Sequence, residues 1–276
     1  TIPSDNTLTI DGTISNNGTI EVQSNGTYAL NKDNTLGNFV WLPGGIFNLG
    51  SDISTFLSTP FTIPQNSTFV LGGEMVVSAT TFTISDGSTL ILNPSANIRL
   101  VSNAILNNNG TLNLYGEIEN NAVINQHSGS SLTQFPGGRL SNVGVLNLDN
   151  ASLILKTTDS YILDDGGVIN WTNGGLLQFD AGITYLSESD LTIPTDGILR
   201  VNGSFYSKST LINNGSVELN TGGLFSLEGT STDVLNNFTW TGGHLIIGPF
   251  VDISKSTATH VKSNSKLTVQ GKLTVP

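Results

Sequence analysis

A short unit recurs along the chain and constrains its fold more than any other feature. Two apolar residues alternate with other residues, a glycine follows, and another apolar residue comes two places later. The unit occurs as LTIDGTI from Leu8, FVLGGEM from Phe69, LNLYGEI from Leu112, LRVNGSF from Leu199 and LTVQGKL from Leu267. Alternation places the apolar side chains on one side of an extended strand, and glycine lets the backbone turn or bulge. Each copy therefore predicts a strand, a corner and a second strand.

Two further units return between these copies. An Asn-Asn-Gly element leads into apolar alternation in NNGTIEV from Asn16, NNGTLNL from Asn108 and NNGSVEL from Asn213, with a weaker NVGVLNL from Asn142. Because Asn-Gly readily takes positive φ, these elements are expected to turn the chain. A bulky residue precedes a glycine pair in WLPGGIF from Trp41, QFPGGRL from Gln134, WTNGGLL from Trp171 and WTGGHL from Trp240. The three tryptophans are expected to be packed rather than exposed, because they recur with the repeat.

The recurrence favours a solenoid over other all-β folds. Helical periodicity is nearly absent, a β-sandwich gives no reason for the same corners to return, and a propeller needs blades of near-constant length. Stacked coils bury similar residues at similar corners while the loops vary. We therefore expect residues 1–276 to form a single all-β domain, a right-handed parallel β-helix of about 11–13 coils with uncapped ends. Trp41 and Trp171, like Thr62 and Thr192, are 130 residues apart, which predicts a degenerate internal repeat of that length.

Composition excludes several classes of function. The chain has 10 Lys and Arg against 21 Asp and Glu, a formal charge of −11, so it lacks the basic surface expected of a nucleic-acid partner. It contains no cysteine, which removes disulfides, zinc thiolates and thiol catalysis. No apolar stretch approaches the roughly 18 residues of a membrane helix, so membrane insertion is not expected.

A search for reactive groups predicts neither catalysis nor a cofactor. The most acidic local sequence contains Asp164 and Asp165, but adjacent residues on a strand point to opposite sides, and an Asp-Gly turn explains them. His127, His244 and His260 fall in different repeats and lack metal-ligand spacing. Thr-any-Thr pairs, such as those at Thr7 and Thr81, occupy different phases of the repeat, so a flat threonine lattice of the ice-binding kind is not expected either.

Asn-any-Ser/Thr sequons are the candidate modification sites. Their number is close to chance, because Asn, Ser and Thr are abundant, but their placement at turns would suit surface glycans. The candidate asparagines are Asn17, Asn25, Asn66, Asn109, Asn150, Asn170, Asn202, Asn214 and Asn237.

The two ends of the chain resemble each other. SNSKLTVQGKLTV from Ser263 repeats the pattern of SDNTLTIDGTI from Ser4, and neither end carries a polar cap. Two explanations fit this: the chain is a segment of a longer surface protein, or one copy docks head to tail on the next through strand edges. The residues expected at this junction are Leu8, Ile10 and Ile14 at one end and Leu267, Val269, Leu273 and Val275 at the other.

The segments NNGTLNLYG, NFTWTGGHL and GGVINWTNGGLL resemble the degenerate repeats of large secreted surface proteins, the filamentous-haemagglutinin-like adhesins with right-handed β-helices. The resemblance implies an extracellular or cell-surface location. The similar ends and the lack of a convergent reactive site lead us to expect a non-catalytic structural protein that forms filaments. The alternatives are an adhesin or carbohydrate-binding rod with glycan partners and, less favoured, a polysaccharide-active β-helix enzyme.

Overall fold

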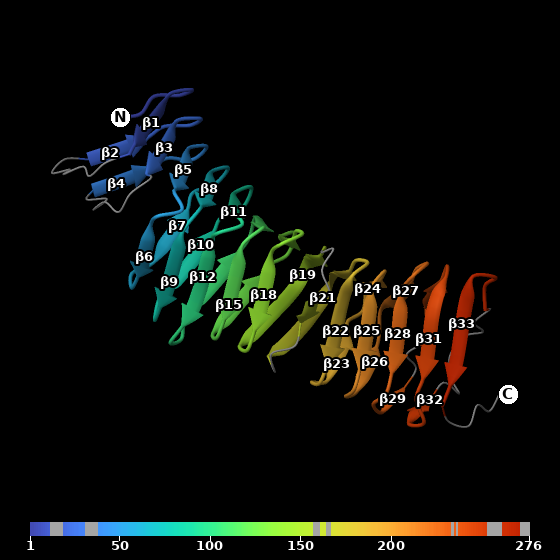
Figure 1. The fold of residues 1–276 in the computed structure, drawn as a ribbon. Helices are drawn as coiled ribbons and strands as arrows, with labels where there is room; N and C mark the ends of the chain where they lie inside the picture. Colours follow the sequence, from blue (N-terminus) through green and yellow to red (C-terminus); the bar gives the residue numbers. More distant parts are fainter. Residues whose placement is uncertain are drawn as a thin grey trace.

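A computed structural model shows an elongated β-solenoid of about 11 turns, with the N- and C-termini at opposite ends of the rod (Figure 1). It describes residues 1–11, 19–30, 38–156, 161–163, 167–232, 235, 237–252 and 261–270. All regular structure in these ranges is β-strand, and every paired strand runs parallel to its neighbour. The predicted fold class is therefore confirmed, while the right-handed winding remains a prediction.

Where the described residues cover a whole turn, that turn contributes strands to three faces, which we number in chain order. Face 1 contains β2 (Thr19–Val22), β4 (Asn38–Trp41), β7 (Phe61–Ile63), β10 (Thr81–Ile84), β13 (Ile105–Asn108), β16 (Val123–Gln126), the first parts of β19 (Val145–Leu155) and β21 (Val168–Phe179), β23 (Leu191–Ile193), β26 (Leu211–Asn213), β29 (Ser231–Thr232) and β32 (Val251–Asp252).

Face 2 follows face 1 in each turn and forms an unbroken series of paired strands. It contains β1 (Thr7–Ile10), β3 (Thr27–Leu30), β5 (Ile46–Leu49), β8 (Thr68–Leu71), β11 (Thr89–Leu92), β14 (Thr111–Leu114), β17 (Ser131–Gln134), the second parts of β19 and β21, β24 (Gly197–Val201), β27 (Ser216–Leu219) and β30 (Phe238–Trp240).

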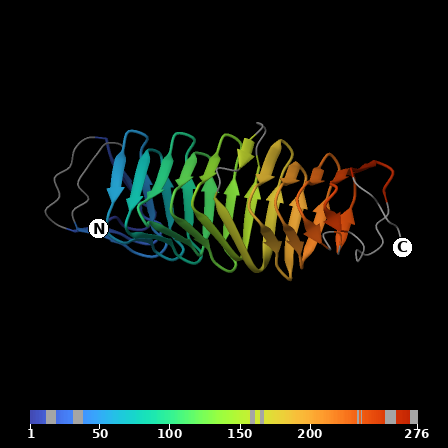
Figure 2. The ribbon, with the colours of Figure 1, turned by 90° about the horizontal axis from the view of Figure 1, so that it is seen from below.

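Face 3 completes the turn. It contains β6 (Ser54–Leu57), β9 (Glu74–Ser78), β12 (Asn97–Val101), β15 (Glu117–Asn120), β18 (Arg139–Asn142), β20 (Tyr161–Leu163), β22 (Ile183–Ser187), β25 (Ser204–Ser207), β28 (Leu224–Leu227), β31 (Gly243–Ile247) and β33 (Ser265–Val269). Figure 2 shows the strands of successive turns side by side along the rod.

The hydrogen-bonded sheets are interrupted on two of the faces. Face 1 consists of three paired runs, from β2 to β4, from β7 to β21 and from β23 to β32. Face 3 consists of two paired runs, from β6 to β18 and from β20 to β33. The long strands β19 and β21 pass from face 1 to face 2 and join those faces into one 16-stranded sheet. The break between β21 and β23 borders the groove described below.

The core is built from columns of like residues stacked in register. On the inner side of face 2, Tyr28 pairs with Phe47 and Phe47 with Phe69, with ring centroids 5.8 and 5.4 Å apart. Leucines continue the column from Leu90 and Leu112 onward, all of them buried. Partly exposed and buried residues alternate along these strands, as the sequence alternation predicts, so the apolar members of each unit form the interior.

The strand-glycine-strand unit is confirmed as a corner between faces 2 and 3. The copies that start at Phe69, Leu112 and Leu199 each join a face 2 strand to a face 3 strand. At Gly116 a side chain would overlap the carbonyl oxygen of Ala96 in the preceding turn, which explains the glycine. The copy that starts at Leu267 differs, because its strand β33 pairs with β31 and so lies on face 3.

The Asn-Asn-Gly elements turn the chain by a different mechanism from the predicted one. At Asn108 and Asn213 the side-chain Oδ1 accepts hydrogen bonds from the backbone N–H groups of Gly110 (3.0 Å) and Gly215 (3.1 Å). Neither the second asparagine nor the glycine of these two elements is among the described residues with positive φ. The expectation of positive φ is therefore wrong here, since a buried asparagine side chain makes the turn.

Positive φ instead gathers along the corner between faces 1 and 2. Backbone groups stack there from turn to turn, for example from Asn25 N–H to the Gly44 carbonyl (2.7 Å) and from Gly129 N–H to the Asn150 carbonyl (3.1 Å). The left-handed residues of this corner are Asp5, Asn25, Gly44, Asn66, Gly87, Gly129, Asn150, Asn173, Gly174, Asp196 and Asn237. All are Asn, Asp or Gly, the residues that adopt this conformation at least cost.

The tryptophans are packed, as predicted. Trp171 and Trp240 are 5% and 4% exposed, and Trp41 packs against the core from a partly buried position. Trp41 and Trp171 both lie on face 1, in agreement with their 130-residue spacing, but Trp240 ends the face 2 strand β30. The expectation of one shared place for all three is therefore wrong, because the same Gly-Gly element can form the corner after face 1 or after face 2.

Candidate functional site

The sequons separate into those whose side-chain amide is already used in the fold and those whose amide is not. Five of the predicted asparagines donate their Nδ2 group to a neighbouring turn: Asn109 to Ile84, Asn150 to Ser128, Asn170 to Asn147, Asn202 to Asp180 and Asn237 to Gly215. Asn25, Asn66 and Asn214 are exposed at the corner between faces 1 and 2. Asn17 lies outside the described residues. Glycan attachment at any of them remains a prediction.

The residues expected at an end-to-end junction lie on different faces. Leu8 and Ile10 belong to β1 on face 2, whereas Leu267 and Val269 belong to β33 on face 3. Leu8 and Leu267 are 38% and 36% exposed. The predicted Ile14, Leu273 and Val275 fall outside the described residues.

A shallow groove lies where the face 1 sheet is interrupted between β21 and β23. It encloses about 540 Å³ and is lined mainly by Trp171, Thr172, Asn173, Pro194, Thr195 and Asp196. The indole Nε1 of Trp171 donates to the Gly174 carbonyl (2.6 Å), and Asn173 donates to the Asp149 carboxylate (2.8 Å). Trp171 is only 5% exposed, so the accessible lining consists largely of polar groups, the Asp196 carboxylate among them.

The outer surface of face 2 carries a regular column of hydroxyl groups that the sequence analysis missed. We call the outward side chains from β1 to the second part of β19 the hydroxyl face. Its first column consists of Thr7, Thr27, Ile46, Thr68, Thr89, Thr111, Ser131 and Ser152. Its second column consists of Thr9, Ala29, Asn48, Val70, Ile91, Asn113, Thr133 and Ile154.

A signal for this column is present in the sequence. Segments such as QSNGTYAL, PQNSTFVL and SDGSTLIL each place threonine two residues after a left-handed Asn or Gly. Thr-any-Thr pairs do not reveal it, because most strands of face 2 place a single threonine on the outer surface, without a second threonine two residues later. The pairs themselves are dispersed, as predicted, since Thr7 lies on face 2 and Thr81 on face 1.

The adjoining face 1 presents amides that bond to one another. Asn125 donates to Asn107 (2.8 Å), Asn147 to Asn125 (2.7 Å) and Asn170 to Asn147 (2.9 Å). This ladder runs along the outside of β13, β16, β19 and β21. Each internal amide uses one of its two N–H donors and one of its two lone pairs in the ladder, which stabilises the stack.

Charge is concentrated on face 3 in the N-terminal half of the rod. Arg99 forms ion pairs with Glu119 (3.1 Å) and Glu74 (3.8 Å), and Arg139 pairs with Glu117 (3.1 Å). These side chains are between about one third and one half exposed, so each pair contributes about 0–1 kcal/mol. They are cross-strand pairs between turns and do not form a cluster of convergent carboxylates.

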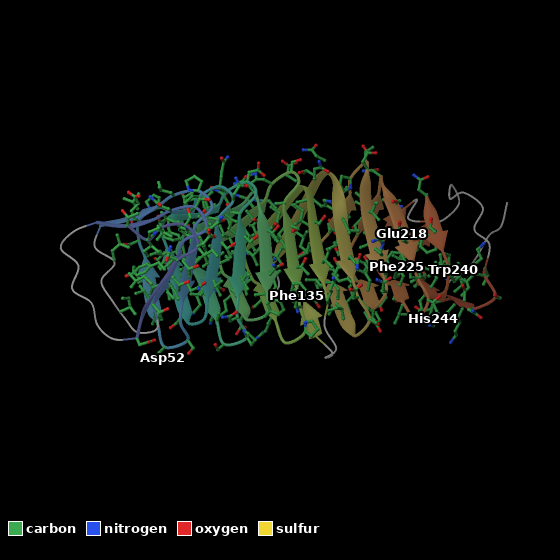
Figure 3. The ribbon with its side chains drawn as sticks, turned by 90° about the horizontal axis from the view of Figure 1, so that it is seen from above. Asp52, Phe135, Glu218, Phe225, Trp240 and His244 are labelled. Carbon is green, nitrogen blue, oxygen red and sulfur yellow. The ribbon has the colours of Figure 1, made fainter. Side chains whose placement is uncertain are left out.

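Two titratable groups near the C-terminal half respond to their surroundings. Hydrogen bonds from the Ser209 side chain and from Thr210 lower the pKa of exposed Asp190, and the Thr210 N–H lies 3.0 Å from the carboxylate. Burial, followed by the nearby Lys266 charge, lowers the pKa of His244, whose Nε2 lies 2.9 Å from Thr268 Oγ1. Figure 3 shows His244 near the C-terminal end, in the same part of the rod as Phe225 and Trp240.

The reactive candidates weighed in the sequence lie partly outside the described residues. Asp164 and Asp165 lie outside the described residues. In the described part of the chain no group of three or more His, Asp or Glu side chains is placed to hold a metal ion. The same part contains no helix with the length and apolarity needed to cross a membrane.

The chain was also compared with known proteins. No protein-family model, no curated protein and no solved structure matches it. The assignment to the β-solenoids therefore rests on the parallel pairing and stacked columns of the structure itself.

Proposed function

We propose that this chain is a non-catalytic, extracellular structural rod that assembles end to end into a filament. The observation that supports this proposal is the state of the outermost strands. Within the described residues β1 pairs only with β3 and β33 only with β31, so each has one side that faces no strand. An unpaired parallel edge is a template for another strand, and a head-to-tail contact that does not close gives an open fibre.

The faces of the outer strands determine how two copies would meet. A junction that stacks Leu8 on Leu267 requires one copy to be rotated by one face about the rod axis, because β1 belongs to face 2 and β33 to face 3. The sequence resemblance to filamentous-haemagglutinin-like surface proteins supports the same class of function, since rods of this architecture serve there as stalks and adhesins. An extracellular location is part of the proposal.

Electron microscopy and light scattering test the assembly. We expect the chain to form unbranched filaments whose mean length rises with concentration. Leu8→Lys and Leu267→Lys should shorten them, because each buries a charge at the junction. Val143→Lys is the matched control, since Val143 is 53% exposed in the middle of the rod. Monomers at every concentration, or equal shortening by the control, would contradict the proposal.

The groove between β21 and β23 favours a second candidate function, a carbohydrate-binding rod. Its lining of hydroxyl, amide and carboxylate groups suits the hydroxyl groups of a sugar. Binding to a glycan array should weaken in Thr195→Lys, which fills the groove, and persist in Thr133→Lys, which lies on another face. Equal binding by both variants would exclude the groove as the site.

A further inference from the structure

We propose that the hydroxyl face binds ice, with crystalline water as its ligand. The proposal does not depend on filament assembly, because it concerns the side of the rod and a single chain presents the whole surface. It goes against the expectation from the sequence, where the dispersed Thr-any-Thr pairs gave no flat lattice. The structure forms one row of hydroxyl groups from different residues, with one threonine or serine from most successive turns.

The residues of the hydroxyl face follow the regular spacing of a parallel sheet. Neighbouring parallel strands lie about 4.8 Å apart, and alternate residues along a strand about 6.6 Å apart. The register is continuous from Thr68 to Thr89 and Thr111 and then to Ser131 and Ser152, with no bulge between them. Rows of oxygen atoms in hexagonal ice repeat on the same scale, so anchored waters can occupy lattice positions.

The hydroxyl groups of the first column are available to water. Thr27, Thr68, Thr89 and Thr111 are partly exposed, and no side-chain hydrogen bond of theirs to another described residue is found. Each threonine offers one donor, two acceptor lone pairs and a methyl group on the same rigid carbon. The hydroxyls can therefore hold water molecules in place. The methyl groups and the aliphatic members of the second column keep water from binding at other positions on the surface.

The absence of charge is shared with face 1 of the same turns and distinguishes this surface from face 3. Neither column contains an Asp, Glu, Lys or Arg, although the chain has a formal charge of −11. The same turns carry Glu74, Arg99 and Glu119 on face 3. An uncharged face complements the neutral ice lattice, whereas ionised side chains hold their own hydration shells and would disrupt it. Farther along face 2 the charged residues begin at Arg200 and Glu218, which limits the proposed surface to the earlier turns.

Crystalline polysaccharide is the main competing ligand for a flat, uncharged face. Sugar rings are held by stacking on exposed aromatic rings, and neither column of the hydroxyl face contains one. The aromatic residues of these strands, such as Tyr28 and Phe69, point inward and are buried. The chemistry of the face therefore favours ice over cellulose or chitin.

Three measurements test the proposal on the intact chain: thermal hysteresis, incorporation into a slowly growing ice hemisphere, and sedimentation with microcrystalline cellulose and chitin. We expect thermal hysteresis and incorporation for the unmodified chain. Thr89→Lys and Thr111→Lys, at the centre of the face, should each lower thermal hysteresis roughly tenfold, as expected for a central contact of a flat interface. Thr89→Val keeps the methyl group and should retain more activity than Thr89→Lys.

The matched control is Thr83→Lys. Thr83 belongs to the same turn as Thr89, is exposed to a similar degree and lies on face 1. Thermal unfolding of each variant shows whether it has kept its fold. Ice activity that survives in Thr83→Lys and is lost in Thr89→Lys supports the proposal. No ice activity in the unmodified chain, equal loss in both variants, or sedimentation with a polysaccharide in place of ice overturns it.

Discussion

The side-chain amide of Asn147 donates to Asn125 and accepts from Asn170, so one outward residue connects three turns of the rod. Amide ladders of this kind join each side chain to the next turn through one donated hydrogen bond. They hold neighbouring strands in register in addition to the backbone bonds. A break in the ladder should therefore weaken the stack locally.

Asn147→Ala removes two of these hydrogen bonds and leaves two partner amides to find water. We expect the free energy of unfolding to fall by about 1–2 kcal/mol. The measurement is equilibrium unfolding in guanidinium. Asn113→Ala is the control, because Asn113 points outward from face 2 and has no hydrogen bond to its side chain among those found in the described residues. A loss as large in the control would show that the ladder contributes nothing of its own.

The aromatic stack at the N-terminal end should contribute more to stability than any surface contact. Phe69 is fully buried, stacks on Phe47 and contacts Trp41, Phe61 and Phe82. Phe69→Ala creates a cavity in a packed column, and we expect a loss of about 3–5 kcal/mol in the free energy of unfolding. Phe56→Ala is the comparison, since Phe56 is 63% exposed and its removal should change stability by less than about 0.5 kcal/mol. Similar losses for both would contradict this account of the core.

The sequence was sufficient to predict the architecture because the core depends on a local pattern. Alternation assigns Leu112 and Leu114 to the interior, and the glycine of LNLYGEI marks the corner that follows. In a parallel solenoid, similar residues of successive turns stack on one another, so each copy of the unit forms the same strand and corner. The structure confirms the stacked parallel strands without a matching relative.

The sequence could not determine which face each unit occupies. The same strand-glycine unit lies on face 2 at Leu112 and on face 3 at Leu267. The corners between the faces are similar enough for one unit to fit more than one of them. Face assignment depends on the cumulative length of all preceding turns, which vary. The hydroxyl face was missed for this reason: its threonines form a column only after each turn has been placed, and no local window contains two neighbours of the column.

The corner between faces 1 and 2 gives a test of backbone conformation alone. Gly129 has φ of 80°, and a side chain there would meet no other atom within 4 Å. Gly129→Ala should therefore lower the free energy of unfolding by about 1–2 kcal/mol through left-handed strain and not through a clash. Gly129→Asn should cost less, because Asn25, Asn66 and Asn150 adopt the same conformation at equivalent corners. We expect the unfolding temperature to decrease in the order Gly, Asn, Ala at position 129. Equal unfolding temperatures for Gly129 and Gly129→Ala would contradict this.

Acid should loosen the last described turn before it affects the remainder of the rod. His244 on β31 lies opposite Lys266 on β33, and burial together with this positive charge lowers the pKa of His244 below its ordinary value of 6.5. The folded state therefore binds this proton less readily than the unfolded state does. The resulting stability is present above pH 6.5 and falls as the pH decreases from there toward the folded pKa.

Hydrogen exchange measured between pH 8 and pH 5, with rates corrected for intrinsic exchange, would show this effect as reduced protection of β33 at the acid end. His244→Gln cannot take up the proton, so protection of β33 should become independent of pH in this range. His127→Gln is the matched control, because His127 lies at a corner near the middle of the chain, and the acid-induced loss should persist in that variant. Asp190 does not interfere, since hydrogen bonds from Ser209 and Thr210 keep its pKa below 3.8 and outside this range. If β33 loses protection equally in His244→Gln, the pairing of His244 with Lys266 is not the origin of the acid sensitivity.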